Sequence, residues 1–143
     1  MIRVVVDTNV LVSRYLSPTR VPSQVLRRWQ QKAFDLVVSE LILAEYRKVL
    51  AYNHVRRIHR LTDEELAREV QNLRELALIV ETSQDLHVVA DDPADDKFVE
   101  AAVVGGADFI VSGDRHLLQV RSFQGVRVLT PVAFLAVLDA ENQ

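Results

Sequence analysis

The chain contains 143 residues, of which 49% are hydrophobic, four are glycine and four are proline, and its formal net charge is −3. This composition is typical of a folded globular protein and excludes a disordered or fibrous one. Because the sequence contains no cysteine, disulfide frameworks, thiolate zinc sites and cysteine nucleophiles are excluded as well.

Strands and helices are predicted to alternate along the chain. Short apolar runs predict strands at 4–6, 36–38, 109–111 and 126–129, and a further strand near 79–81 that overlaps the end of a helix. Helices are predicted from Pro22 to about Lys32, from the cap Ser39 to about Leu50, after the capping box Thr62–Glu65, from 93–95 to Val104, over Asp114–Leu118, and from Pro131 onward. This alternation predicts one α/β domain over residues 1–143, with a parallel sheet covered on both faces.

Two acids follow predicted strands. Asp7 comes directly after Val4-Val5-Val6, and Asp114 comes three residues after Val111, through Ser112 and Gly113. Ligands of open parallel sheets bind beyond the carboxyl ends of the strands, so we expect both acids at one edge of the sheet. The alternative for Asp7 is a purely structural helix N-cap.

Glu45 is an acid on the apolar face of its predicted helix, with Leu41, Ile42 and Val49 one turn away. Burying an isolated carboxylate is costly unless a cation or a hydrogen-bond donor compensates it. Either a bound metal or a buried arginine would satisfy Glu45.

A run of four acids occupies residues 91–96, at the start of the predicted helix. Some of them are expected as ordinary N-terminal acids that favour the helix dipole. Asp95 and Asp96 are both in phase with Val99, so periodicity does not choose between them. Dispersed carboxylates without cysteine or paired histidines favour Mg²⁺ or Mn²⁺ over zinc.

These motifs resemble the four acidic motifs of the PIN domain. They are Val-Val-Val-Asp7-Thr8-Asn9, Glu45 in Ala-Glu-Tyr-Arg-Lys-Val-Leu, Asp96 in Asp-Asp-Lys-Phe-Val-Glu-Ala-Ala, and Asp114 in Ile-Val-Ser-Gly-Asp. The order and spacing of the motifs match over the whole chain, and the resemblance is closest to the PIN-family (VapC-like) toxins of toxin–antitoxin pairs.

The resemblance implies a three-layer α/β/α sandwich with a central five-stranded parallel sheet. It also implies a cytoplasmic Mg²⁺- or Mn²⁺-dependent ribonuclease that is the toxin of a type II pair, forms a homodimer and binds a cognate antitoxin. It assigns the metal and the catalysis to Asp7, Glu45, Asp96 and Asp114. Thr8, Asn9, Asp95 and Ser112 would assist, as would Asp92.

Basic residues are concentrated early in the chain: residues 14–60 contain 10 Lys and Arg against 3 Asp and Glu. Such a window favours an anionic partner. Arg14 and Arg20 follow the first strand and could contact RNA phosphates, as could His116 beyond Asp114. Arg27-Arg28 and Arg56-Arg57 would either extend an RNA track or bind an acidic antitoxin segment. The alternative for each is a solvated surface position.

No membrane partner is expected, because the N-terminal apolar run is too short for a signal peptide and no segment approaches the roughly 20 apolar residues of a membrane span. Two other functions fit parts of the pattern. A phosphohydrolase of the haloacid dehalogenase type also places an Asp after its first strand, but it needs a second Asp where this chain has Asn9. A non-catalytic binding module would keep the acids as a salt-bridge cluster.

Overall fold

The computed structural model describes residues 1–83, 85–89 and 92–141. Six strands form one sheet in the order β3-β2-β1-β4-β6-β5. They are β1 (Arg3–Val6), β2 (Asp35–Ser39), β3 (Leu78–Val80), β4 (Phe109–Val111), β5 (Ser122–Phe123) and β6 (Val126–Leu129). Neighbouring strands are parallel except for β5, which pairs antiparallel with β6. The expected five-stranded parallel sheet is confirmed, and β5 adds a sixth strand at one edge.

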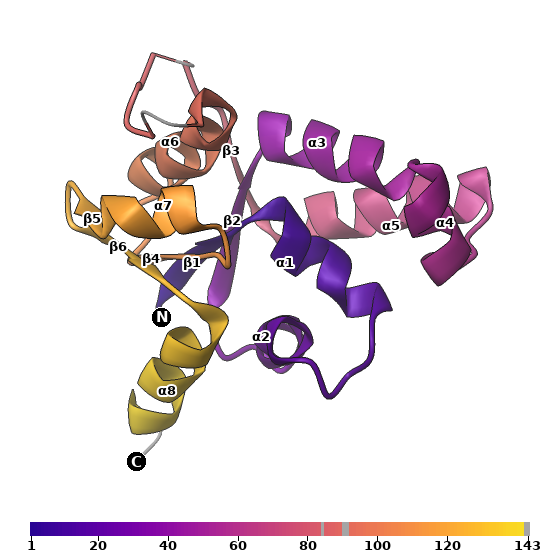
Figure 1. Cartoon of the computed structure of the whole chain (residues 1–143), viewed down its shortest axis with the longest axis horizontal. Helices are drawn as coiled ribbons and strands as arrows, with labels where there is room; N and C mark the ends of the chain where they lie inside the picture. Colours follow the sequence, from indigo (N-terminus) through magenta and orange to yellow (C-terminus); the bar gives the residue numbers. More distant parts are fainter. Residues whose placement is uncertain (84, 90–91, 142–143) are drawn as a thin grey trace.

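Helices surround the sheet (Figure 1). They are α1 (Thr8–Val12), the 3₁₀ turn η1 (Ser13–Tyr15), α2 (Val21–Gln30), α3 (Glu40–Leu50), α4 (Asn53–His59), α5 (Asp63–Leu76), the 3₁₀ turn η2 (Pro93–Asp95), α6 (Asp96–Val104), α7 (Arg115–Val120) and α8 (Pro131–Glu141). Helix α6 packs against β1, β2 and β4, whereas α3 packs against β2 and α8 against β6. The predicted layered α/β architecture is therefore confirmed. No helix in the described part of the chain is long and apolar enough to cross a membrane.

Strand β1 is the centre of the core. Val4 and Val5 are completely buried, and β1 lies between β2 and β4. A parallel strand covered on both faces needs an unbroken apolar run, which is the pattern that predicted β1. The chain leaves β1 toward β2 and β3 and later returns to β4 on its other side, so the strand order reverses between β1 and β4. Such a switch point is where α/β sheets bind ligands.

The predicted caps are confirmed. The Ser39 hydroxyl accepts the Ile42 N–H at 3.2 Å and so starts α3. Thr62 and Glu65 form the reciprocal capping box that starts α5, with distances of 3.1 and 3.0 Å. Such caps satisfy backbone donors that a helix leaves free at its first turn.

Four elements were not predicted, namely α1, η1, α4 and β5. Helix α1 has only five residues, and Val55 is the one buried residue of α4. Neither sequence therefore repeats apolar residues over several helical turns, which is the pattern that predicts a helix. The strand expected near 79–81 is β3, which begins and ends one residue earlier. Asp114 is the N-cap of α7 and not its first residue.

Gly105 lies where the end of α6 approaches β2. A Cβ atom there would lie 2.5 Å from Val37 Cγ1 and 2.9 Å from the Ala101 carbonyl oxygen. We therefore expect Gly105→Ala to lower the free energy of unfolding by about 1–3 kcal/mol, because packed atoms must shift. Urea unfolding followed by circular dichroism measures this change. Gly113→Ala is the control, because nothing lies within 4 Å of its added Cβ; equal midpoints for the two variants would contradict the close packing.

Candidate metal centre

Asp7 directly follows the carboxyl end of β1, on the edge of the sheet where the parallel strands end. Val6 pairs with Val111 in the parallel register, and the Asp7 N–H donates to the Val111 carbonyl at 3.1 Å. The Asp7 carboxylate is 5% exposed. Its Oδ1 accepts the Val10 N–H at 2.8 Å, and its Oδ2 accepts the Ser112 hydroxyl. Asp7 is thus both the predicted N-cap of a helix and an acid at the predicted strand edge.

Ser112 joins the first acid to the second. Its fully buried hydroxyl donates to Asp7 and accepts the Asp114 N–H at 2.9 Å. Asp114 in turn caps α7, because its Oδ1 accepts the His116 N–H at 2.7 Å. Ser112 therefore fixes the spacing between Asp7 and Asp114, and its assisting role stays a prediction.

Burial raises the pKa of Asp7 above its usual value. Hydrogen bonds from Ser112 and the Val10 N–H oppose this shift, and the charge of Asp114 adds to it. The charge of Asp114 therefore disfavours the charged form of Asp7. A cation between them would remove that cost.

Asp95 is the third acid that faces this edge. Burial, together with the charges of Asp92, Asp114 and Asp7, raises the pKa of Asp95 to about 7, against an opposing effect of Lys97. Its buried Oδ2 has no hydrogen-bond partner among the residues that the structure describes. Buried polar atoms are nearly always paired, so this oxygen indicates a missing donor or cation.

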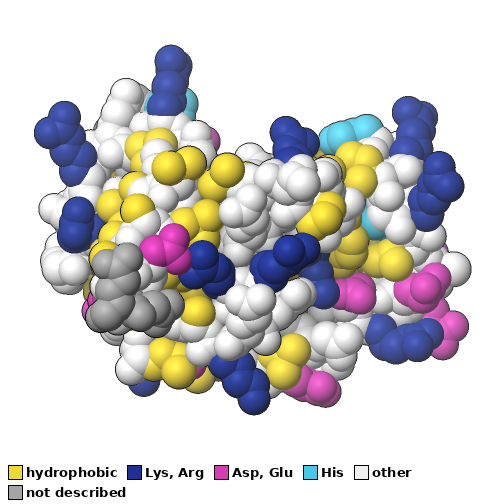
Figure 2. Space-filling view, turned by 90° about the horizontal axis from the view of Figure 1, so that it is seen from below, with side chains coloured by type: hydrophobic (Ala, Val, Ile, Leu, Met, Phe, Trp, Pro, Cys, Tyr) yellow, Lys and Arg dark blue, Asp and Glu magenta, His cyan; other side chains and the backbone are white. Residues whose placement is uncertain are grey.

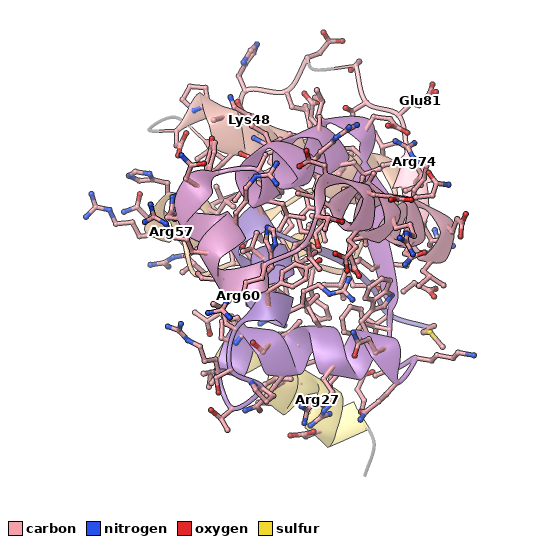
Figure 3. The ribbon with its side chains drawn as sticks, turned by 90° about the vertical axis from the view of Figure 1, so that its right-hand side faces the viewer. Arg27, Lys48, Arg57, Arg60, Arg74 and Glu81 are labelled. Atoms are coloured by element: carbon pink, nitrogen blue, oxygen red, sulfur yellow. The ribbon has the colours of Figure 1, made fainter. Side chains whose placement is uncertain are left out.

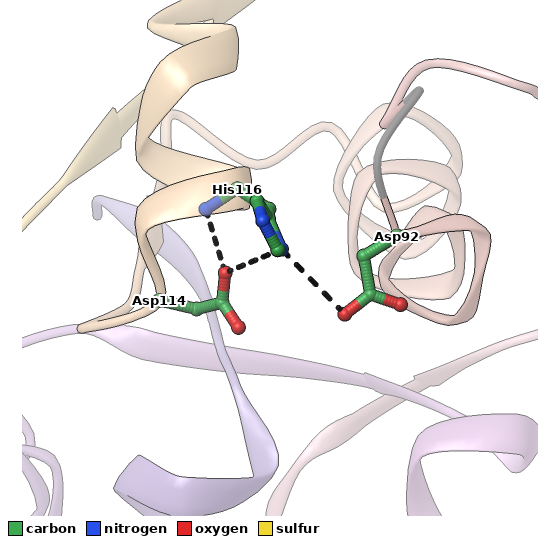
Figure 4. A group of neighbouring side chains, drawn as sticks. All are labelled: Asp92, Asp114 and His116. Atoms are coloured by element: carbon green, nitrogen blue, oxygen red, sulfur yellow. Dashed lines mark hydrogen bonds and ion pairs between the residues drawn. The ribbon is translucent and has the colours of Figure 1, made fainter.

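Asp92, Asp114 and His116 form a half-buried group beside Asp95 (Figure 4). The His116 Nδ1 atom lies 3.8 Å from Asp114 Oδ1 and 4.0 Å from Asp92 Oδ2. One ligand atom of each residue lies within 4.8 Å of the others, which suits a shared cation. Asp91, also in the acidic run, lies outside the described residues.

Glu45 borders the same edge from α3. Its side chain is 34% exposed; Oε2 accepts the Thr8 hydroxyl, and Oε1 lies 3.4 Å from the ammonium of Lys97. The ion partner is thus a lysine from α6 and not a buried arginine. Thr8 connects Glu45 to the residue that directly follows Asp7.

Asp96 has different surroundings from Asp95. Its buried Oδ1 accepts the N–H groups of Val88 and Val89, both at 2.8 Å, and its Oδ2 lies 4.0 Å from His87 Nδ1. Asp96 therefore holds the segment that precedes η2. Periodicity left Asp95 and Asp96 equivalent, and their hydrogen bonds distinguish them.

The remaining predicted residues lie outside this group of contacts. Asn9 is exposed on α1, and Arg20 is exposed at the start of α2. Arg14 pairs with Glu69 of α5 at 3.2 Å, so its guanidinium is already engaged. Lys97 was not predicted as a site residue; the only sequence signal was its position directly after the acidic run.

Comparisons with known proteins bear on the fold and the family of the chain. No curated protein matches the chain in sequence. Among solved structures, VapBC2 from Rickettsia felis bound to a DNA fragment from their promoter is similar, with a TM-score of 0.56, 10% identity and coverage of 90% of this chain and 98% of that one. FitAB bound to the IR36 DNA fragment has the same TM-score, 18% identity and coverages of 90% and 94%. The family model described as PIN domain matches residues 3–116. Because this match covers most of the 143 residues, the chain belongs to the PIN domain family.

Proposed function

We propose that this protein is a divalent-metal-dependent endoribonuclease that hydrolyses RNA phosphodiester bonds. The observation that carries the proposal is the buried Asp95 Oδ2, which has no hydrogen-bond partner among the described residues and lies near other carboxylates. Such an atom is costly unless a cation compensates it. Membership of the PIN domain family supports the same conclusion.

Four carboxylates would hold the cation, from Asp7, Asp92, Asp95 and Asp114. The quartet expected from the sequence was Asp7, Glu45, Asp96 and Asp114. In the proposed set, Asp95 takes the position given to Asp96, and Asp92 is included in place of Glu45. Glu45 stays a candidate ligand, because it borders the site through Thr8. Carboxylate oxygens favour a hard cation, so the proposed ion is Mg²⁺ or Mn²⁺.

When bound, a divalent cation would supply Lewis-acid chemistry that activates water and offsets negative charge on the phosphate. The side chains of the chain position the carboxylates: Ser112 fixes Asp7 relative to Asp114, and Thr8 orients Glu45. Ser112 and Thr8 are both buried, so neither hydroxyl is presented to a substrate as a nucleophile. Water is therefore the nucleophile that this site favours.

We further propose that the protein is the toxin of a type II toxin–antitoxin pair, acts in the cytoplasm, forms a homodimer and binds a cognate antitoxin. The acidic motifs resemble those of VapC-like toxins, and the fold is similar to those of VapBC2 and FitAB. A phosphohydrolase of the haloacid dehalogenase type is disfavoured, because its second Asp is replaced by the exposed Asn9.

Asp7→Asn tests the proposed activity. Removing one charge from the centre should lower the rate of RNA cleavage in Mn²⁺ by at least about 100-fold. Gel electrophoresis of an end-labelled RNA measures the rate. Asp108→Asn is the matched control. Asp108 directly precedes β4, at the opposite end of the strands from Asp7, and accepts the Arg3 N–H at 2.9 Å. This variant should keep the parent rate.

Cleavage and Mn²⁺ binding by Asp7→Asn equal to those of the parent would overturn the proposal. Two small substrates separate the competing chemistries. A nuclease should hydrolyse the diester bis(p-nitrophenyl) phosphate, whereas a phosphohydrolase of the haloacid dehalogenase type should prefer the monoester p-nitrophenyl phosphate. A binding module should hydrolyse neither.

Asp95→Asn and Asp96→Asn test which acid faces the cation. The folded-state pKa of Asp95 is raised from 3.8 to about 7, so its ionisation costs stability as the pH rises from 4 through 7. Without metal, Asp95→Asn should therefore stabilise the protein at pH 8 by about 1–2 kcal/mol, a value discounted for partial exposure, and by little at pH 4.

Asp96→Asn should instead lower stability, because the neutral amide oxygen is a weaker acceptor than the Asp96 carboxylate for the two backbone N–H groups. Urea unfolding in EDTA measures both variants, and isothermal titration with Mn²⁺ measures metal affinity. The assignment of Asp95 predicts that Asp95→Asn loses Mn²⁺ affinity while Asp96→Asn largely retains it. The reverse order of affinities would return the ligand role to Asp96.

A further inference from the structure

Helix α4 and the residues around it form a basic arm, defined here as residues 47–62. This segment contains five Lys and Arg and two His but no Asp or Glu. In Figure 1, α4 lies at the opposite end of the molecule from α6, α7 and α8. Figure 2 shows Lys, Arg and His side chains at the same end, beside a hollowed face.

Most cations of the basic arm are uncompensated. Arg56 pairs with Asp63 at 2.8 Å. Arg47, Lys48, Arg57 and Arg60 are exposed and have no ion-pair partner in the part of the chain that the structure describes. Figure 3 shows Lys48, Arg57 and Arg60 around α4. The basic arm therefore carries positive charges that do not form ion pairs with the described residues around them.

An aromatic pair lies at the start of α4, within the same basic arm. The rings of Tyr52 and His54 stack with centroids 5.9 Å apart and an interplanar angle of 28°. Tyr52 is 43% exposed, and Val55 is the one buried residue of α4. With only 6% aromatic residues in the chain, no stacking surface is expected from composition. Packing against the core does not explain the exposed ring.

We propose that the basic arm binds a single-stranded segment of RNA beyond the cleavage site, with Arg57 and Arg60 on phosphates and a base stacked on Tyr52. Exposed cations beside an accessible aromatic ring are the features that bind single-stranded nucleic acid. This inference rests on the proposed ribonuclease function, because it assigns a second contact to the same substrate.

The arm lies within reach of a strand that enters the metal centre. Helix α3 carries Glu45 at that centre and leads directly to the arm. Its rise of 1.5 Å per residue places Leu50 about 8 Å beyond Glu45 along the helix axis. An acidic peptide is a weaker fit, because an amphipathic partner needs an apolar stripe and Ile58 is the one large aliphatic side chain of the described arm that is strongly exposed.

The test is the double variant Arg57→Gln/Arg60→Gln with an end-labelled, unstructured 20-nucleotide RNA in EDTA, so that binding is measured without cleavage. Removing two phosphate contacts should weaken binding roughly 25-fold at 0.1 M salt and reduce the slope of log K against log salt by about 1.4. Hydrolysis of bis(p-nitrophenyl) phosphate in Mn²⁺ should be unchanged, because that substrate is too small to reach the arm.

Arg121→Gln/Arg127→Gln is the matched control. It removes the same charge near β5 and β6, far from α4 in Figure 1. Arg121 and Arg60 are both helix C-caps with positive φ, at 62° and 56°, so backbone effects are comparable. The control should bind the 20-nucleotide RNA within about 3-fold of the parent. Equal affinity and salt slope for both double variants would overturn the proposal.

Tyr52→Ala and Tyr52→Phe test the stacked base. Loss of the ring should weaken binding of the same RNA by about 5-fold or more, whereas Phe keeps the ring and the affinity. Equal binding by Tyr52→Ala would remove the base contact. Tighter binding of a 20-residue polyglutamate than of the RNA would assign the arm to a protein partner instead.

The outcomes also separate this inference from the proposed function. A parent that binds RNA through the arm but hydrolyses neither RNA nor the small diester would refute the ribonuclease and leave the arm intact. A parent that cleaves RNA, with affinity unaffected by changes in the arm, would refute the arm alone.

Discussion

The parallel register of β1 with β4 is the constraint on which the site depends. Pairing of Val6 with Val111 places Asp7 and Ser112 side by side, although 105 residues separate them in the chain. One buried hydroxyl then bonds to the carboxylate of Asp7 and the backbone of Asp114. A one-residue shift of this register would turn the side chains of a strand to its other face and separate these groups. The core strands therefore set the geometry of the acids.

Charge is divided between two regions of the molecule. The acids concentrate at the carboxyl ends of β1 and β4, where burial and mutual repulsion raise the pKa of Asp7 and Asp95. The unpaired cations of residues 47–62 lie around α4. RNA has both a phosphate that needs a cation at the reacting centre and phosphates that bind cationic side chains elsewhere. The two regions are therefore complementary parts of one proposed substrate path.

The sequence predicted the positions of the acids that come after the ends of predicted strands. Asp7 and Asp114 were placed correctly because an apolar run precedes each of them. Asp95 and Asp96 could not be separated, since adjacent residues share the same phase with Val99. Their difference arises from the backbone N–H groups of residues 88 and 89, a segment without a periodic pattern. Long-range partners such as Glu69 for Arg14 were equally invisible, as was the short helix α4 with its single buried residue.

The two outer strands of the sheet also limit how copies of the chain can associate. β3 has three residues and β5 has two, and β5 turns back antiparallel. Such short edges present little unpaired backbone to another sheet, which is how natural proteins avoid edge-to-edge aggregation. Joining two sheets into one continuous sheet is therefore disfavoured. Self-association of this protein would have to use side chains on helix surfaces, where specificity is set by shape and charge and not by backbone pairing.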